Sequence, residues 1–332
     1  MNMTKKALYP LLAIAIAVIA GCSSAPPQDP QTQELTYPYK IATTCGMVTN
    51  VVDVVAGDKA VVSGIMGENV DPHLYRPTRD DVKLLQGADV IFYSGLMLEG
   101  RMADVFAKAG RSGKPVYAVT ENLDEEYLLE PPEFEGHWDP HVWTDVSAWS
   151  EAVGVVSAGL SDVDPANAEV YQANATEYRL KLAKLHEYGK AAIASIPQEN
   201  RALITAHDAF GYFGRAYGIE VRAVQGLTTE SEAGIKDVND LVDFIVERKI
   251  SAVFVESSVS DKAINAVIEG AKSKGWVVTK GGTLFSDAMG AGGTYEGTYV
   301  GMMDHNFTTI AKALGGTVPE GGFKSQTESQ SE

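Results

Sequence analysis

Residues 164–197 read DPANAEVYQANATEYRLKLAKLHEYGKAAIASIP, and this uninterrupted stretch decides the fold. Asp164 and Pro165 have the order of a helix cap followed by a first-turn proline, and no helix breaker follows before Pro197. At 1.5 Å per residue, the predicted helix is about 46 Å long. Its apolar side chains form one stripe that can be buried along the whole length; they are Tyr171, Tyr178, Leu182, Leu185, Ala192 and Ile196.

Short apolar or β-branched runs alternate with helical patterns on both sides of this helix, which predicts parallel sheets. Before the helix, strands are expected at 39–44, 60–66, 90–93 and 116–119, with helices near 47–55, 79–85 and 98–108. After it, strands are expected at 202–205, 221–224, 252–256 and 277–280, with helices between them and a last helix near 295–314. The predicted fold class is therefore α/β, with two lobes that each contain a parallel four-stranded sheet flanked by helices.

The domain boundaries follow from this pattern. Residues 39–163 form the predicted N-terminal lobe, 164–197 the connecting helix and 198–315 the C-terminal lobe. Within the first lobe, Thr78 and Asp81 have the spacing of a capping box. One connecting helix is stiffer than several crossing strands, so closure by small tilts of the lobes is expected. The Gly/Ser/Glu-rich residues 316–332 are predicted to be a disordered tail.

The N-terminus has the pattern of an export signal. Lys5 and Lys6 precede an apolar run at 7–20 that is too short to span a bilayer, so residues 1–21 are predicted to be a signal peptide. The run ends in Ile19-Ala20-Gly21-Cys22, which resembles a bacterial lipobox and implies lipidation of Cys22. Residues 22–38, rich in Ser, Pro and Gln, are the expected tether. The predicted location is extracytoplasmic, anchored to a bacterial membrane in the periplasm or at the cell surface; the alternative is an ordinary secreted protein.

Composition limits the partners. Without the leader the chain has about 310 residues, enough for two domains. It then carries 25 basic and 44 acidic side chains, a net charge of −19 that disfavours nucleic acid and anionic lipid headgroups. A cation suits this charge better, although an acidic surface also keeps an exported protein soluble. Cys45 is the only cysteine besides Cys22, so no intrachain disulfide is expected.

The tripeptide Asp-Pro-His occurs twice, at Asp71-Pro72-His73 and at Asp139-Pro140-His141. Proline restricts the residue before it and fixes its own φ, so each histidine is presented from a stiff loop. The adjacent aspartate could accept a hydrogen bond from the imidazole nitrogen that does not face a metal ion. Asp-Pro is also a common turn, and the alternative for a single copy is a surface loop.

Two further candidates follow predicted strands of the second set. His207 comes directly after the strand at 202–205, and Asp287 follows the last strand through Gly281-Gly282. Ligands of open α/β sheets bind at the carboxyl ends of strands, so His73 and His141 are expected to face His207 and Asp287. Three imidazoles and one carboxylate suit one zinc ion, and the carboxylate leaves manganese and ferrous iron open. The alternatives are a helix N-terminal residue for His207 and an Asx turn for Asp287.

Six stretches in order resemble the zinc- and manganese-binding receptors of ABC importers, the cluster A-I solute-binding proteins of the TroA type. They lie at residues 70–75, 88–96, 139–143, 205–213, 254–258 and 284–290, and the resemblance covers nearly all of 39–315. It implies two four-stranded lobes joined by a long helix, and metal ligands at His73, His141, His207 and Asp287. It also implies delivery of the ion to a membrane permease that works with a separate ATPase subunit. The protein is expected to be monomeric.

Two differences from the dedicated members of this family leave the identity of the metal ion open. Zinc-dedicated relatives often carry a His-rich loop before the second ligand, whereas residues 121–135 contain no histidine. Manganese-dedicated relatives typically have glutamate where this chain has His207. Of the remaining histidines, His137 is expected in a solvated loop with a spare-ligand role as the alternative, His186 is expected to be exposed, and His305 has no ligand partner at a suitable spacing.

Two other function classes fit the sequence less well than a receptor does. A surface adhesin would need a repeat, stalk or aromatic patch, and the sequence has none of these. A mononuclear zinc hydrolase would need an open coordination position and a general base, for which Glu230, Glu232 and Glu256 are the candidates. Four protein ligands would close the site, so the chain is predicted not to be an enzyme. It has no P-loop pattern, and ATP hydrolysis would belong to the separate subunit.

Overall fold

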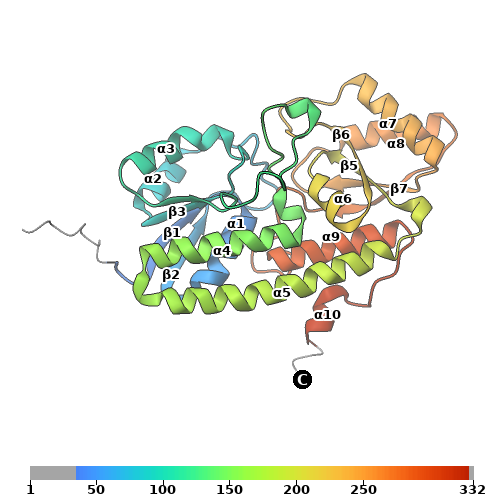
Figure 1. Ribbon diagram of the computed structural model, residues 1–332. Helices are drawn as coiled ribbons and strands as arrows, with labels where there is room; N and C mark the ends of the chain where they lie inside the picture. Colours follow the sequence, from blue (N-terminus) through green and yellow to red (C-terminus); the bar gives the residue numbers. More distant parts are fainter. Residues whose placement is uncertain (1–34, 329–332) are drawn as a thin grey trace, which may run out of the picture. The chain divides into compact units, whose positions relative to one another are not determined.

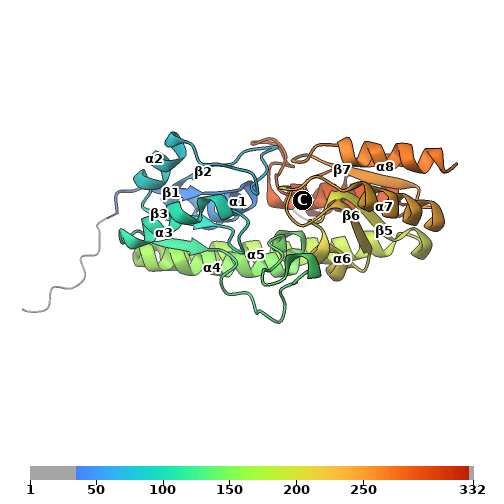
Figure 2. The same ribbon diagram turned by 90° about the horizontal axis from the view of Figure 1, so that it is seen from above.

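The computed structural model describes residues 35–328. The predicted signal peptide, Cys22 and the last four residues lie outside this range. Among the described residues, the chain from Thr36 onward forms one compact unit, in which two lobes lie along one long helix (Figures 1 and 2). The α-helices are α1 (Gly46–Ala56), α2 (Arg79–Gly87), α3 (Ala103–Arg111), α4 (Val146–Val163), α5 (Ala168–Ala194), α6 (Gly211–Tyr217), α7 (Ile235–Arg248), α8 (Lys262–Ser273), α9 (Tyr299–Ala313) and α10 (Gly322–Glu328). Short 3-10 turns lie between them, at η1 (Gly57–Lys59), η2 (Gly100–Met102), η3 (Pro132–Phe134), η4 (Val142–Thr144), η5 (Pro165–Asn167) and η6 (Gln198–Asn200).

The first lobe contains the predicted parallel four-stranded sheet. Its strands are β1 (Tyr39–Thr43), β2 (Ala60–Gly64), β3 (Val90–Tyr93) and β4 (Val116–Ala118), in the order β2-β1-β3-β4. Ile41 of β1 is in register with Val62 of β2 on one side and Val90 of β3 on the other. The Thr78 and Asp81 capping box is present and begins α2. The sequence located these four strands to within two residues.

The second lobe differs from the prediction, because its four strands form two parallel pairs. The pairs are β5 (Ala202–His207) with β6 (Glu220–Gln225), and β7 (Ala252–Glu256) with β8 (Thr279–Leu284). No ladder joins β5 to β7 among the described residues. Where the two strands approach, the Glu256 side chain accepts hydrogen bonds from the backbone N–H groups of Ala206 and His207. A side chain therefore replaces the backbone pairing at this point.

The last strand also lies further along the chain than expected. The sequence placed it at 277–280 with a glycine turn after it, whereas Val277 is exposed and Gly281 and Gly282 belong to β8. A Cβ atom on Gly281 would lie 2.7 Å from the Phe254 ring and 2.9 Å from the Ala313 side chain. Glycine is required here for close packing against β7 and α9, not for a turn.

The long helix connects the lobes as predicted, but it begins at Ala168 and has 27 residues. Residues 165–167 form η5, with Asp164 as its N-cap residue and Pro165 in its first turn, as predicted. The Asp164 side chain makes no capping bond, and its carboxylate instead accepts hydrogen bonds from the hydroxyl groups of Tyr171 and Tyr37. Tyr37 lies within the predicted tether at 22–38. Because its hydroxyl group bonds to Asp164, the folded unit begins before Tyr39. All six residues of the predicted apolar stripe are buried, as expected.

Helix α4, an 18-residue helix that packs along α5, is not among the predicted elements (Figure 1). Asp145 caps it by accepting a hydrogen bond from the Ser147 N–H. Its apolar residues face α1 and α5, and Trp149 is fully buried. An N-cap aspartate followed by apolar residues three and four apart was the signal available in the sequence.

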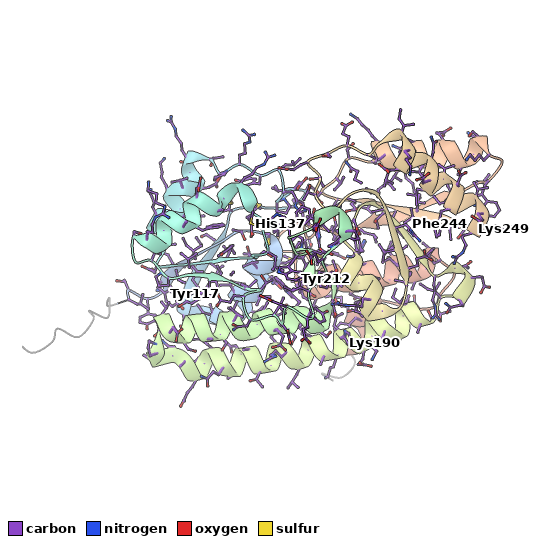
Figure 3. All side chains as sticks on the ribbon, turned by 45° about the horizontal axis from the view of Figure 1, so that its top comes forward. Tyr117, His137, Lys190, Tyr212, Phe244 and Lys249 are labelled. Carbon is purple, nitrogen blue, oxygen red and sulfur yellow. The ribbon has the colours of Figure 1, made fainter. Side chains whose placement is uncertain are left out.

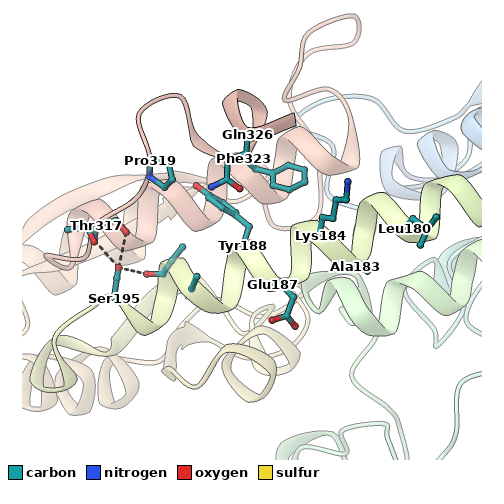
Figure 4. Close-up of a pocket in the computed structure, with 12 residues that line it drawn as sticks. Leu180, Ala183, Lys184, Glu187, Tyr188, Ser195, Thr317, Pro319, Phe323 and Gln326 are labelled. Carbon is teal, nitrogen blue, oxygen red and sulfur yellow. Dashed lines mark hydrogen bonds between the residues drawn. The ribbon is translucent and has the colours of Figure 1, made fainter. Parts of the chain in front are cut away.

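The predicted disorder of the tail is wrong for residues 316–328. The Asp304 carboxylate on α9 accepts hydrogen bonds from the backbone N–H groups of Phe323 (2.8 Å) and Lys324 (3.1 Å) at the start of α10. Phe323 is 2% exposed and packs against Tyr188 of α5. Figure 4 shows the pocket that α5 and this segment line, with the Ser195 hydrogen bonds at one end. The buried Phe323 ring and the buried Asp304 carboxylate hold in place a segment whose composition is typical of disorder.

Candidate metal centre

Four polar side chains meet between the lobes. His73 lies in the loop after β2, His141 lies just before η4, His207 is the last residue of β5 and Asp287 follows β8. One possible ligand atom from each lies within 4.8 Å of all the others. His73 is 6% exposed, Asp287 1%, and the other two are fully buried. The structure thus brings together the four residues that the sequence selected, and among the described residues they form the one group that could hold a metal ion.

All three imidazoles direct Nε2 toward the Asp287 carboxylate. The distances from Nε2 to the nearest Asp287 oxygen are 3.2 Å for His207, 3.4 Å for His141 and 3.9 Å for His73. The His207 Nε2 atom and both Asp287 oxygens are buried without a hydrogen-bond partner among the described residues. Buried polar atoms normally have a partner because desolvation without one is costly. A cation held by these atoms would satisfy them, so the donor set fits one metal ion.

Two carboxylates orient two of these rings from behind. The His141 Nδ1 atom is 2.7 Å from Asp139 Oδ1, and the His207 Nδ1 atom is 2.5 Å from Glu256 Oε2. Each bond fixes the tautomer and leaves Nε2 free to face the centre. The expected role of Asp139 is confirmed. The sequence suggests Glu256 only as a general base. Its position at the carboxyl end of β7 is the signal that could have predicted its contact with the His207 ring.

Asp71 behaves differently from Asp139. Its Oδ1 atom accepts a hydrogen bond from the backbone N–H of His73 at 2.9 Å, and its Oδ2 atom accepts one from the Thr229 hydroxyl in the second lobe. The prediction that Asp71 supports the His73 ring is therefore wrong. The second lobe offers its carboxylate a hydroxyl donor, and the bond to Thr229 directs the side chain away from the imidazole.

The charges within the centre are strongly coupled. Burial lowers the pKa of His73 to about 3. Burial also opposes charge on His141, but the Asp139 hydrogen bond and the Asp287 carboxylate outweigh it and raise the pKa of His141 to about 9. Burial acts in the same way on His207, where Glu256 and Asp287 raise the pKa well above its usual value. For Asp287, burial opposes ionisation, yet His207 and His141 hold its pKa well below the usual range. An incoming metal ion would therefore compete with protons for the imidazoles of His141 and His207.

Buried hydrogen bonds tie the His141 segment to the second lobe. The Tyr212 hydroxyl on α6 donates to the Asp139 carbonyl at 2.9 Å, and Figure 3 shows Tyr212 where the lobes meet. The Trp143 indole N–H donates to the Ser286 carbonyl at 2.8 Å, next to Asp287. The Tyr299 hydroxyl donates to the Trp143 carbonyl at 2.7 Å. The relative positions of His141 and Asp287 are thus set by buried contacts.

The remaining histidines and Cys45 lie outside the centre. His137 is exposed and lies against Phe134. His186 is half-buried and 3.3 Å from the Tyr217 hydroxyl, which corrects its expected exposure. His305 is 2.8 Å from the Thr283 carbonyl oxygen. Cys45 is 1% exposed, as expected for a small buried hydrophobe, and burial raises the pKa of its thiol to about 12.

Comparison with known proteins agrees with this arrangement. Residues 41–313 match the family model described as ZnuA, the periplasmic component A of the zinc-uptake complex. The chain belongs to the ZnuA family. The resemblance to TroA-type receptors of cluster A-I, recognised from six motifs, is thereby confirmed.

Relatives of this ZnuA-family chain are named for two different metals. It is 44% identical over 311 residues to the manganese-binding lipoprotein MntA of Bacillus subtilis, covering 93% of this chain and 99% of the relative. It is 45% identical over 274 residues to the zinc-binding protein TroA of Treponema pallidum, covering 82% and 88%. The solved structure of that periplasmic zinc-binding protein TroA superposes with a TM-score of 0.80 at 44% identity, covering 83% of this chain and 99% of that one. The α/β fold with parallel sheets is confirmed by this likeness. Within residues 35–328, no helix has the length and apolar character needed to cross a membrane.

Proposed function

We propose that this protein is an extracytoplasmic receptor that captures one divalent transition metal ion between its lobes and delivers it to an ABC importer. The ion is cargo, held by Nε2 of His73, His141 and His207 and by the Asp287 carboxylate. The observation that carries the proposal is the buried set of unpartnered atoms at His207 and Asp287, facing two further imidazoles. Membership of the ZnuA family supports the same function.

The cargo is zinc or manganese. Three neutral nitrogens favour zinc, whereas the carboxylate suits the harder manganese ion, and ferrous iron also fits the set. Relatives with 44% and 45% identity are named for manganese and for zinc. His73 and His141 come from the first lobe and His207 and Asp287 from the second, so binding would couple the two lobes.

Anchoring at Cys22 would keep the receptor beside its permease. The leader has the order of a lipoprotein signal, and several relatives are named as lipoproteins. The permease and its separate ATPase subunit would be the partners. A monomer suffices for this role, because all four proposed ligands come from one chain.

The two alternatives receive less support. A hydrolase needs a free general base near the metal, yet Glu256 binds two backbone N–H groups and the His207 ring, and Glu230 pairs with Arg101. Glu232 is exposed on the loop before α7. We therefore propose a binding protein without enzymatic activity. For the adhesin, family membership favours metal uptake instead.

Metal removal and return tests the proposal. After chelator treatment, the mature protein should bind one Zn²⁺ or Mn²⁺ per chain and melt at a higher temperature, because a ligand of the folded state stabilises by about 2.7 kcal/mol at one hundred times its Kd. Asp287→Asn should abolish most of this shift, since it removes the anionic ligand. Asp261→Asn, at an exposed carboxylate paired with Lys280, is the control. Unchanged melting of the unmodified protein with both ions would refute the proposal.

A further inference from the structure

The His73 segment is held differently from the other proposed ligands. His141 and His207 are each supported through Nδ1 by a carboxylate, whereas Asp71, next to His73, bonds to Thr229 of the second lobe. His73 is also the most exposed of the four. Its position therefore depends on a contact between the lobes.

A second contact joins the same two segments. The Arg101 guanidinium in η2 donates to the carbonyl oxygen of Leu74 at 3.3 Å and forms an ion pair with Glu230 at 2.7 Å. Thr229 and Glu230 are consecutive and lie between β6 and α7. We call residues 226–234 the latch loop. Thr229 contacts Asp71, two residues before His73, and Glu230 is linked through Arg101 to Leu74, the residue after His73.

The contacts that the latch loop makes with the first lobe should break more easily than the other hydrogen bonds between the lobes. The Tyr212, Trp143 and Tyr299 bonds at the His141 side are buried. By contrast, the side chains of Arg101 and Glu230 are 32% and 52% exposed. Water can replace exposed polar contacts at little cost, whereas breaking the buried ones would leave polar groups unsatisfied. The side of the centre that carries His73 is therefore the weaker one.

We propose that the latch loop positions His73 and sets the rate at which the metal ion leaves, with Thr229 and Glu230 as positioning residues. This inference rests on the proposed metal-binding function. Separation of the loop frees Asp71 and removes Glu230 from Arg101, the residue that holds Leu74, so His73 withdraws from the ion first. His141, His207 and Asp287 keep their buried supports and hold the ion until it is transferred.

The test measures release of Zn²⁺ from the loaded protein into excess chelator by stopped flow. Thr229→Val removes the hydroxyl at nearly constant volume and should speed release about tenfold, because hydrogen bonds to charged groups are among the stronger ones. Glu230→Gln removes one charge of a partly exposed pair and should speed release about two- to fivefold. Thr229→Ser should restore the slow rate, and exchanging the charges in Arg101→Glu with Glu230→Arg should restore part of it. The metal-free variants should still melt in one cooperative transition well above the temperature of the assay, so that faster release reports on the loop and not on unfolding.

Glu151→Gln is the matched control. It breaks the Arg179–Glu151 pair, which has the same 2.7 Å distance and side-chain exposures of 41% and 57%, but joins α4 to α5. Release from this variant should equal that of the unmodified protein. If the unmodified protein binds Zn²⁺ but Thr229→Val and Glu230→Gln release it no faster than Glu151→Gln, the latch proposal is wrong. Absence of Zn²⁺ binding by the unmodified protein would instead contradict the proposed function.

Discussion

His207 is the proposed ligand whose replacement should change metal preference most directly. A neutral imidazole favours Zn²⁺, whereas a carboxylate adds a hard oxygen and a negative charge that suit Mn²⁺. We expect His207→Glu to lower Zn²⁺ affinity at least about tenfold more than Mn²⁺ affinity. His73→Ala and His141→Ala should weaken both ions.

Competitive titration calorimetry of both ions at one fixed pH above about 7 gives the comparison, because protons displaced from the site then affect both metals alike. His137→Ala is the control, because this histidine is exposed and lies outside the centre. Equal losses for the two metals in His207→Glu would remove the basis for the selectivity argument.

Glu256 should matter although it cannot reach the ion directly. Its carboxylate holds the His207 ring through Nδ1 and also accepts two backbone N–H groups. Glu256→Gln keeps the shape and an acceptor oxygen but loses the charge, so metal affinity should fall about 10- to 100-fold, as for other partners of ligating histidines. Glu232→Gln, at an exposed position, should have no effect. Equal affinities in the two variants would show that the ring needs no charged support.

The packing of strand β8 depends on the small size of Gly281. A Cβ atom on Gly281 would come within 3 Å of both Phe254 and Ala313, so Gly281→Ala forces the strand away from β7 or α9. Overpacking of this kind costs about 1–3 kcal/mol of the free energy of unfolding. Denaturant titration of the metal-free protein measures the loss. Gly110→Ala near the end of α3 is the control, because nothing lies within 4 Å of its added methyl group. Equal stability of the two variants would contradict the packing described for β8.

The two long helices show why element prediction was uneven. The apolar stripe of α5 is separated by polar residues and is visible as a periodic pattern. In α4, ten of 18 residues are buried, so apolar residues occur on several sides and the period is less clear. A helix packed on more than one face loses the contrast that a sequence pattern relies on.

At the scale of the whole molecule, metal capture should release protons. Asp139 and Asp287 raise the pKa of His141 to about 9, and that of His207 is also raised, so both rings tend to be protonated near neutral pH. A metal ion binds only the neutral imidazole and must displace these protons. Zn²⁺ affinity should therefore rise between pH 6 and 9, by about tenfold per pH unit for each proton released. Calorimetry in buffers of different ionisation enthalpy counts the protons. A pH-independent affinity with no proton release would contradict the charge coupling within the centre.

The expectation that closure occurs by small tilts stays a prediction. The helix pair α4 and α5 packs against elements of both lobes, and the Trp143, Tyr212 and Tyr299 bonds cross between them. These contacts oppose a wide hinge motion. Motion confined to the latch loop would be consistent with them.

The sequence by itself determined the features that depend on neighbouring residues. The two Asp-Pro-His tripeptides, the apolar stripe of the long helix, the capping box at Thr78 and most strands follow from local backbone restriction and side-chain periodicity. Two candidates, His207 and Asp287, could be placed at one site because the ends of parallel strands meet at the same edge.

Only the tertiary structure decided which distant groups meet. Glu256 supports His207 and Thr229 captures Asp71 because strands and loops far apart in the sequence are packed together. The contact of Phe323 with Tyr188 orders a segment whose composition is typical of disorder. At Gly281, the nearby Phe254 ring leaves no room for a side chain, which explains why glycine occurs in this strand. No local pattern encodes these contacts, because a hydrogen bond or a packed ring depends on the position of a partner that the chain supplies only after folding.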